Sequence, residues 1–288
     1  MERDKKMKKG RKIKIHVLNA LMKICFAFIL VLVIAIIGYI LYRGLPHISW
    51  NFLTTKPSVL NDNVGILPNI LNTLYVVIIT LIFALPLSVG AAIYLNEYAK
   101  PGKLVSIIEF AIETLSGIPS IIYGLAGMLI FVRFLGLQTG LLAGSLTLAV
   151  MTLPTIIRNT QESLKTVPNS YREGALALGS GKWHMIRTVV LPSAIDGIVT
   201  GCILAVGRIV GESAALLYTA GMANNILSFA QAVTPGNSGS TLSVALYVYA
   251  AERGDKDTAF AIAAILLILT LGINLLAKLA AKKLKNKN

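Results

Sequence analysis

The run NILNTLYVVIITLIFALPLSVGAAIYLN, residues 69–96, contains no Asp, Glu, Lys or Arg. A helix needs about 20 mostly apolar residues to cross the hydrocarbon core of a bilayer, so this run is long enough to cross it with some tilt. The run therefore predicts a membrane-spanning α-helix.

Runs of similar length lie on both sides of it, and only 14% of the chain is charged, where about a quarter is usual in soluble domains. Four further runs are free of charge, and a fifth carries only Asp196, Arg208 and Glu212. The uncharged runs are 24–42, 114–132, 134–157 and 258–277, and the charged one is 193–221. Together they predict an all-α membrane protein with six transmembrane helices.

The chain has 27 Lys and Arg against 13 Asp and Glu, a formal net charge of +14. With six spans and the N-terminus inside, twenty of these basic residues fall in segments expected in the cytoplasm: 1–16, 97–106, 158–192 and 278–288. The loops expected outside carry four. This asymmetry follows the positive-inside rule. We therefore expect both termini in the cytoplasm, with membrane lipid and no nucleic acid among the partners.

This topology gives a basic cytoplasmic tail at 1–16, disordered or lying on anionic lipid, and a second at 281–288. The first transmembrane helix and an outer loop occupy 17–67, and the main membrane domain occupies 68–280. The first apolar run is too long for a signal peptide, so we expect it to remain as an anchor. Residues 241–251 are too short to span and are expected to lie on, or re-enter, the outer surface.

The third expected span contains SGIPS, residues 116–120. Gly117 and Pro119 weaken a helix there, and proline also removes one backbone donor. Broken helix at membrane depth persists only against protein or water. The motif therefore predicts either a lined pathway or a site of close helix packing.

The inside loop, 158–192, contains a short segment with its own helix signals, VPNSYREGALALGSGKWH. Pro168 stops the preceding helix, Ser170 and Glu173 fit a capping box, and Gly179 occupies the position of a C-cap glycine. The residues between them are small and apolar. Such a helix fits a groove on a partner protein, although a helix lying on lipid is the alternative.

The same segment contains GSGK, the ending of a phosphate-binding P-loop. Leu176 and Trp183 occupy positions where that motif requires Gly and Ser or Thr. We therefore do not expect this chain to bind ATP itself.

The spacing from Glu173-Gly174-Ala175, through Gly179, to Leu191-Pro192 resembles the EAA loop of bacterial ABC-transporter permeases. Gly174 replaces Ala of that pattern, and Val189 replaces Ile. The resemblance implies a type I importer permease fold for 68–280. It also implies that these residues form a coupling helix, which docks on a separate ATPase that binds ATP and Mg²⁺. No cofactor is expected in this chain.

Segments 113–127, 153–179 and 197–221 look like the phosphate-specific ABC permeases, and more like their A subunit than their C subunit. Ala215 departs from the A-type pattern, which usually has Pro there. The resemblance implies a homologous permease subunit, two cytoplasmic ATPase subunits, an external phosphate-binding protein and phosphate as partners. The implied location is the cytoplasmic (inner) membrane of a bacterium or archaeon. Permeases for molybdate or sulfate, and the C-type subunit, remain alternatives.

Arg208 lies near the middle of the run 193–221, where an unpaired charge is costly. On a continuous helix, Glu212 shares its face and lies within ion-pair reach. In one interpretation Arg208 donates to phosphate oxygens on the pathway and Glu212 holds it when the pathway is empty. In the other, the two form a permanent pair that locks helix packing. We favour the pathway role, because an anion pathway needs a cation.

Glu109 and Glu113 share a helix face and raise an alternative of another class, an intramembrane enzyme with paired carboxylates. Acidic residues in a first helical turn are also expected from the helix dipole alone. His16, His47 and His184 are scattered among different segments. We therefore expect no catalytic residues and no metal site.

Overall fold

The computed structural model describes residues 2–58 and 64–285, and the regular elements in these ranges are helices. Within these ranges, five helical spans are long and apolar enough to cross a membrane. Their main helices are α1 (Glu2–Gly44), α3 (Leu67–Ile93), α6 (Leu141–Thr166), α9 (Leu191–Gly211) and α13 (Lys256–Lys285). The predicted all-α membrane class is confirmed.

The sixth predicted span is a bent pair of helices. α4 (Lys103–Gly117) meets α5 (Ser120–Gly127) and its π-helical continuation η3 (Met128–Phe134) at 105°. Pro119 has no N–H to donate, and Ile118 before it is extended, with φ −72° and ψ 130°. The predicted break of this span at Gly117 and Pro119 is confirmed.

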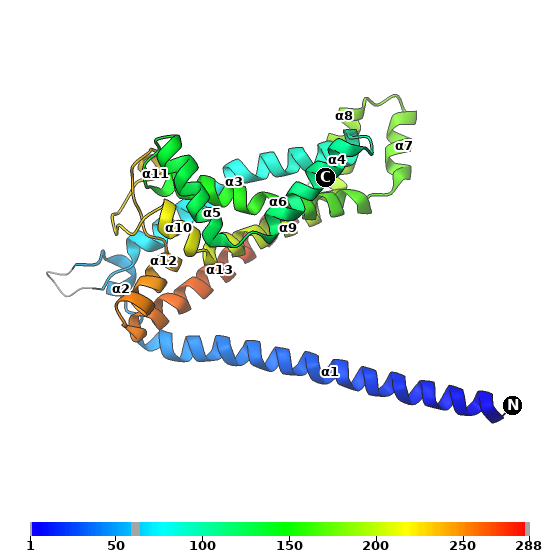
Figure 1. Ribbon diagram of the computed structural model, residues 1–288, viewed down its shortest axis with the longest axis horizontal. Coiled ribbons are helices and arrows are strands. Elements are labelled where there is room, and N and C mark those ends of the chain that lie inside the picture. The colour runs from blue at the N-terminus through cyan, green and yellow to red at the C-terminus, as the bar shows by residue number, and fades with distance from the viewer. Residues whose placement is uncertain (1, 59–63, 286–288) are drawn as a thin grey trace.

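α3, α6 and α9 pack together as the centre of the bundle (Figure 1). Two glycines of α9 allow close approach to α6. A Cβ at Gly197 would collide with the Ser163 hydroxyl, and one at Gly201 would lie 2.9 Å from Asn159 Cβ. The packing of α3, α6 and α9 buries a core that includes Val76, Leu148, Met151 and Ile209.

The helix of the fifth predicted span begins before residue 193 and ends before residue 221. It begins with α8 (Lys182–Met185) and the π-helical turn η4 (Ile186–Val190), which lead into α9. It ends at Gly211, and the chain resumes as α10 (Ala214–Thr219) after a break. Glu212 in the break is extended, with φ −80° and ψ 120°.

α1 touches the rest of the molecule only near its C-terminal end in Figure 1 and extends away from the bundle. There Tyr39 packs edge-on against Phe260 of α13, with ring centroids 5.5 Å apart, and Arg43 lies 3.8 Å from Asp257. Residues 2–16 continue this helix, where the sequence predicts a tail that is disordered or lies on anionic lipid. Contact between this basic segment and lipid stays a prediction.

The end of the bundle near α2 (Trp50–Thr54) also carries η1 (Leu45–His47) and α11 (Phe229–Ala232). α12 (Leu242–Tyr247), with its continuation η5 (Val248–Glu252), covers the short segment 241–251. Leu242, Val244 and Ala245 are buried, and Thr73 Oγ1 accepts from Leu242 N–H at 2.9 Å. The segment therefore re-enters the protein and does not lie on its surface.

Candidate functional site

α7 (Asn169–Ala177) stands at the opposite end of the bundle from α2, between α6 and α8 (Figure 1). It begins directly after Pro168, and no side chain caps its start. Ser170 is therefore inside the first turn, and the predicted Ser170–Glu173 capping box is wrong. Residues 158–166 of the expected loop still belong to α6, so the connection around α7 is residues 167–181.

The C-terminal end of α7 is a complete Schellman motif. Gly179 has φ +80°, and its N–H donates to Leu176 O at 3.0 Å. The Ser180 N–H donates to Ala175 O at 3.1 Å. The predicted C-cap role of Gly179 is confirmed, and the motif fixes where α7 ends.

The outward face of α7 is exposed in the part of the chain that the structure describes. Glu173 and Gly174 are exposed, and a Cβ at Gly174 would meet nothing within 4 Å. Large apolar side chains are exposed beside them, with Leu178 91% exposed. The others are Tyr171, Leu176 and Trp183. Apolar side chains around a carboxylate form a surface suited to a protein partner.

The inward face of α7 packs on the bundle. Ala175 contacts a buried cluster that includes Met185, Ile186 and Val190 and also receives Leu191, the first residue of α9. Pro192 lies in the first turn of α9, directly after η4. A π-helical turn accommodates a proline that cannot complete the helical ladder. The six predicted coupling residues thus divide into an exposed pair, the C-cap glycine and three residues where α7 meets α9.

Arg172 holds α7 in place. Its Nη2 lies 2.8 Å from Oε1 of Glu97, which belongs to η2 (Tyr94–Tyr98), the π-helical end of α3. The side chains are only 15% and 5% exposed. Arg172 also donates to the carbonyls of Val167 at 2.7 Å and Leu164 at 2.9 Å, at the end of α6. One side chain therefore joins three elements.

Sequence reasoning missed this pair. Glu97 is the first charged residue after the run 69–96, and Arg172 stands beside the EAA glutamate. The two are 75 residues apart, and no local spacing rule connects them. An acid at the end of one span and a base in a distant loop were the available signals.

The structure does not join Arg208 and Glu212. Both side chains are partly exposed, and no ion pair between them forms within 4.0 Å. The helix ends at Gly211, so Glu212 leaves the face that carries Arg208. Glu212 Oε1 instead accepts from the Ala215 N–H at 3.0 Å, a donor that proline at 215 would lack. The predicted Arg208–Glu212 pair is therefore wrong in this conformation.

Arg208 is in the last turn of α9, where a cation is favoured by the helix dipole. In α5, the Tyr123 hydroxyl donates to Leu115 O of α4 at 2.7 Å and so links the two helices across their bend. Ile209, the residue after Arg208, belongs to the buried cluster that contains Tyr123 and contacts Leu115, so this end of α9 lies near the broken pair α4–α5. A Cβ at Gly117 would meet nothing within 4 Å, so no close packing within this chain requires that glycine.

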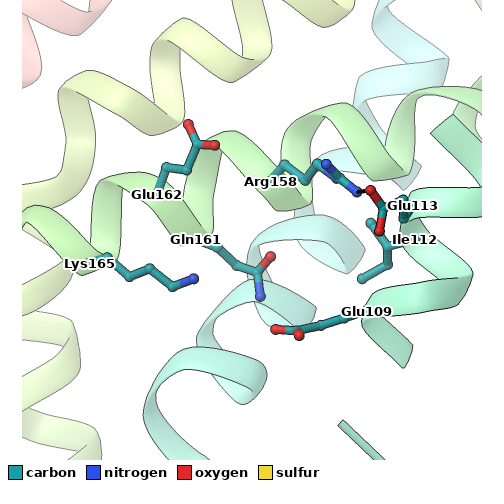
Figure 2. Close-up of a pocket in the computed structure, with 7 residues that line it drawn as sticks. All are labelled: Glu109, Ile112, Glu113, Arg158, Gln161, Glu162 and Lys165. Carbon is teal, nitrogen blue, oxygen red and sulfur yellow. Dashed lines mark ion pairs between the residues drawn. The ribbon is translucent and has the colours of Figure 1, made fainter. Parts of the chain in front are cut away.

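A cleft of about 250 Å³ lies between α4 and α6. Figure 2 shows Glu113 and Arg158 facing each other at 3.7 Å, with Glu109, Gln161 and Lys165 directed toward the open space. α4 begins at Lys103 and has no acid in its first turn, so the dipole explanation for Glu109 and Glu113 is wrong. Arg158 pairs with Glu113 across the cleft, and Lys165 also lines it.

His16, His47 and His184 belong to α1, η1 and α8, and the fold does not gather them. Among the described residues, no three His, Cys, Asp or Glu side chains form a group that could hold a metal ion. The α4–α6 cleft thus combines carboxylates with cations and lacks a histidine.

Comparisons with known proteins agree on one family. The family model described as binding-protein-dependent transport system inner membrane component matches residues 84–286. The chain is 38% identical over 222 residues to the probable ABC transporter permease protein YqgI of Bacillus subtilis, which covers 77% of this chain and 76% of that one. It is 33% identical over 239 residues to the phosphate transport system permease protein PstA of Haemophilus influenzae, covering 82% and 83%.

Among solved structures, a chain of the bacterial alginate ABC transporter in complex with alginate pentasaccharide-bound periplasmic protein superposes with a TM-score of 0.62. The match covers 94% of each chain at 14% identity, and this likeness shows a shared fold.

Proposed function

The chain belongs to the binding-protein-dependent transport system inner membrane component family and so is an ABC importer permease subunit, and we propose that its cargo is inorganic phosphate. In this proposal it forms half of a translocation pathway and pairs with a homologous permease subunit. Two ATPase subunits supply ATP and Mg²⁺ binding on the cytoplasmic side. An external phosphate-binding protein delivers the anion.

The observation that carries the coupling part of the proposal is the surface of α7. This short helix has a fixed C-cap, an exposed carboxylate at Glu173 and exposed apolar side chains at Leu176 and Leu178. Its opposite face packs against the start of α9 through Ala175. A helix of this kind can dock in a groove and pass a displacement to the bundle.

Orientation follows from the same geometry. The end of α13 lies at the α7 end of the bundle in Figure 1, and α1 also extends toward that side. If α7 docks on a cytoplasmic ATPase, the Lys-rich ends of both helices lie in the cytoplasm, as the positive-inside rule requires. The α2 end then faces the binding protein.

The phosphate assignment draws on the relatives named as phosphate permeases and on Arg208. A guanidinium offers fork-shaped donors that match phosphate oxygens. Arg208 has no carboxylate partner within 4.0 Å among the described residues, and the next residue, Ile209, shares a buried cluster with Tyr123 beside the α4–α5 break. We assign Arg208 and this break to the pathway. Because selection rests largely on the external protein, molybdate and sulfate are the competing cargoes.

The test is the ATPase rate of the complex purified with this chain in lipid, measured with binding protein loaded with phosphate, sulfate or molybdate. The proposal predicts stimulation by the phosphate-loaded protein alone. Equal stimulation by another oxyanion would remove the phosphate assignment and leave the permease. An isolated chain that hydrolyses a substrate without any ATPase partner would contradict both.

A further inference from the structure

We propose that Arg172 and Glu97 are a positioning pair, a buried joint through which α7 moves as one body with the adjoining ends of α3 and α6 when the ATPase acts. The proposal rests on the proposed function, because it assigns the pair a role in carrying a displacement of α7 into the membrane domain. It concerns the joint behind the docking surface and not the surface itself.

The joint uses the whole guanidinium of Arg172. Nε lies 3.2 and 3.3 Å from the two Glu97 oxygens, and Nη2 lies 2.8 Å from Oε1. Nη1 donates to Val167 O and faces Asn169 Oδ1 at 3.4 Å, and Nη2 also donates to Leu164 O. Every N–H therefore has an acceptor. Lysine, with a single ammonium on a flexible stem, cannot reproduce this fork.

Glu97 is fixed in turn. Asn96 donates to its Oε1 at 2.8 Å, and the carboxylate is 5% exposed. Removing either charge would leave the other buried without its partner. The pair therefore keeps a fixed geometry.

The other attachments of α7 are weaker. Ala175 contributes one small side chain to the buried cluster, and the flanking connections are short loops. Lys182 of α8, the helix that follows α7, lies over the Tyr98 ring of η2 at 4.8 Å in an exposed cation–π contact. Without the Arg172–Glu97 pair, a force applied by the ATPase to the outer face of α7 would rotate the helix relative to the bundle, because these contacts alone would not hold it. With the pair intact, the load reaches α3 directly, and α3 packs along α6 in the centre of the bundle.

The test uses Arg172→Lys and Glu97→Gln in the full complex, with Lys182→Gln as the matched control. ATPase co-purification, the unstimulated ATPase rate and stimulation by phosphate-loaded binding protein are measured for each. We expect both joint variants to keep the first two and to lose stimulation by about tenfold, the range of ordinary coupling energies. Lys182→Gln should retain stimulation.

A second readout separates a positioning role from a purely structural one. In a chain with Cys25 and Cys202 replaced by Ser, spin labels at Ala177 and Tyr94, both exposed, report the distance between the end of α7 and η2. The proposal predicts that this distance is the same with and without ATP in the parent. It should become ATP-dependent in Arg172→Lys.

Unchanged stimulation in both joint variants, or a distance that ATP does not alter in Arg172→Lys, would overturn the positioning role alone. A change of this distance on ATP addition in the parent complex would also overturn the positioning role alone. A parent complex that contains no ATPase would instead overturn the proposed function, and the joint with it.

Discussion

Arg172 and Glu173 are neighbours in sequence with opposite environments. The arginine is mostly covered and joins α7 to η2 and to the end of α6, whereas the glutamate is exposed and forms no ion pair with a residue that the structure describes. The two neighbours can therefore serve different roles, because Arg172 holds α7 on the bundle and Glu173 remains accessible to a partner. The side chains of α7 thus form one face that packs on the bundle and one face that is exposed.

Replacing Glu173 tests the docking face. Glu173→Ala removes an exposed carboxylate without disturbing a contact in this chain, so we expect a folded permease whose uptake falls about tenfold or more through lost coupling. Glu252→Ala, an exposed acid at the other end of the molecule, is the control and should transport normally. Uptake at the parent rate in Glu173→Ala would remove this residue from the coupling surface.

Replacing Arg208 tests the pathway. Arg208→Gln keeps a polar side chain of similar length and removes the charge, so we expect lower phosphate uptake with an assembled complex. The matched variant is Arg133→Gln, an exposed arginine at the end of η3. Parent-like uptake in Arg208→Gln, measured with labelled phosphate in cells or vesicles, would contradict the pathway role.

At the scale of elements, replacing Gly174 in α7 and Gly179 just after it by alanine should change the stability of the helix in opposite directions. Neither Gly174 nor Gly179 has an atom within 4 Å of an added Cβ, so alanine changes only the backbone energetics. Gly179→Ala forces a side chain into the left-handed region and should destabilise the end of α7 by about 1–2 kcal/mol. Gly174→Ala should stabilise the helix by about 0.5–1 kcal/mol. Hydrogen exchange over residues 169–180 measures both, and shifts of the same sign would contradict the Schellman assignment.

Much of this architecture could be predicted from local sequence patterns. Charge-free length located the spans, proline located the α4–α5 break, and glycine located the end of α7. Local patterns failed where a distant or backbone partner decided the outcome. Glu212 was expected to pair with Arg208 by helical spacing, but the helix ends one residue earlier and a backbone N–H takes its carboxylate. Glu109 and Glu113 were attributed to a helix start that lies further upstream.

At the scale of the whole molecule, the fold separates the proposed coupling surface on α7 from the proposed anion pathway near Arg208. α7 and its joint lie at one end, whereas α2, α11 and the re-entrant α12 lie toward the other (Figure 1). At the α4–α5 break, Tyr123 shares a buried cluster with Ile209, the residue after Arg208. Coupling across this distance requires α3, α6 and α9 to move as packed units, as the close Gly197 and Gly201 contacts allow.

The central claim is that α7 docks on a separate ATPase, and site-specific photocrosslinking tests it most directly. A photoreactive amino acid replaces Leu178, 91% exposed on α7, and in a second chain replaces Trp50, 80% exposed near the opposite end. Irradiation of the complex in native membranes should join position 178 to an ATPase subunit and leave position 50 without that product. Crosslinks from position 178 to lipid alone, or to the ATPase from both positions alike, would contradict the docking role of α7.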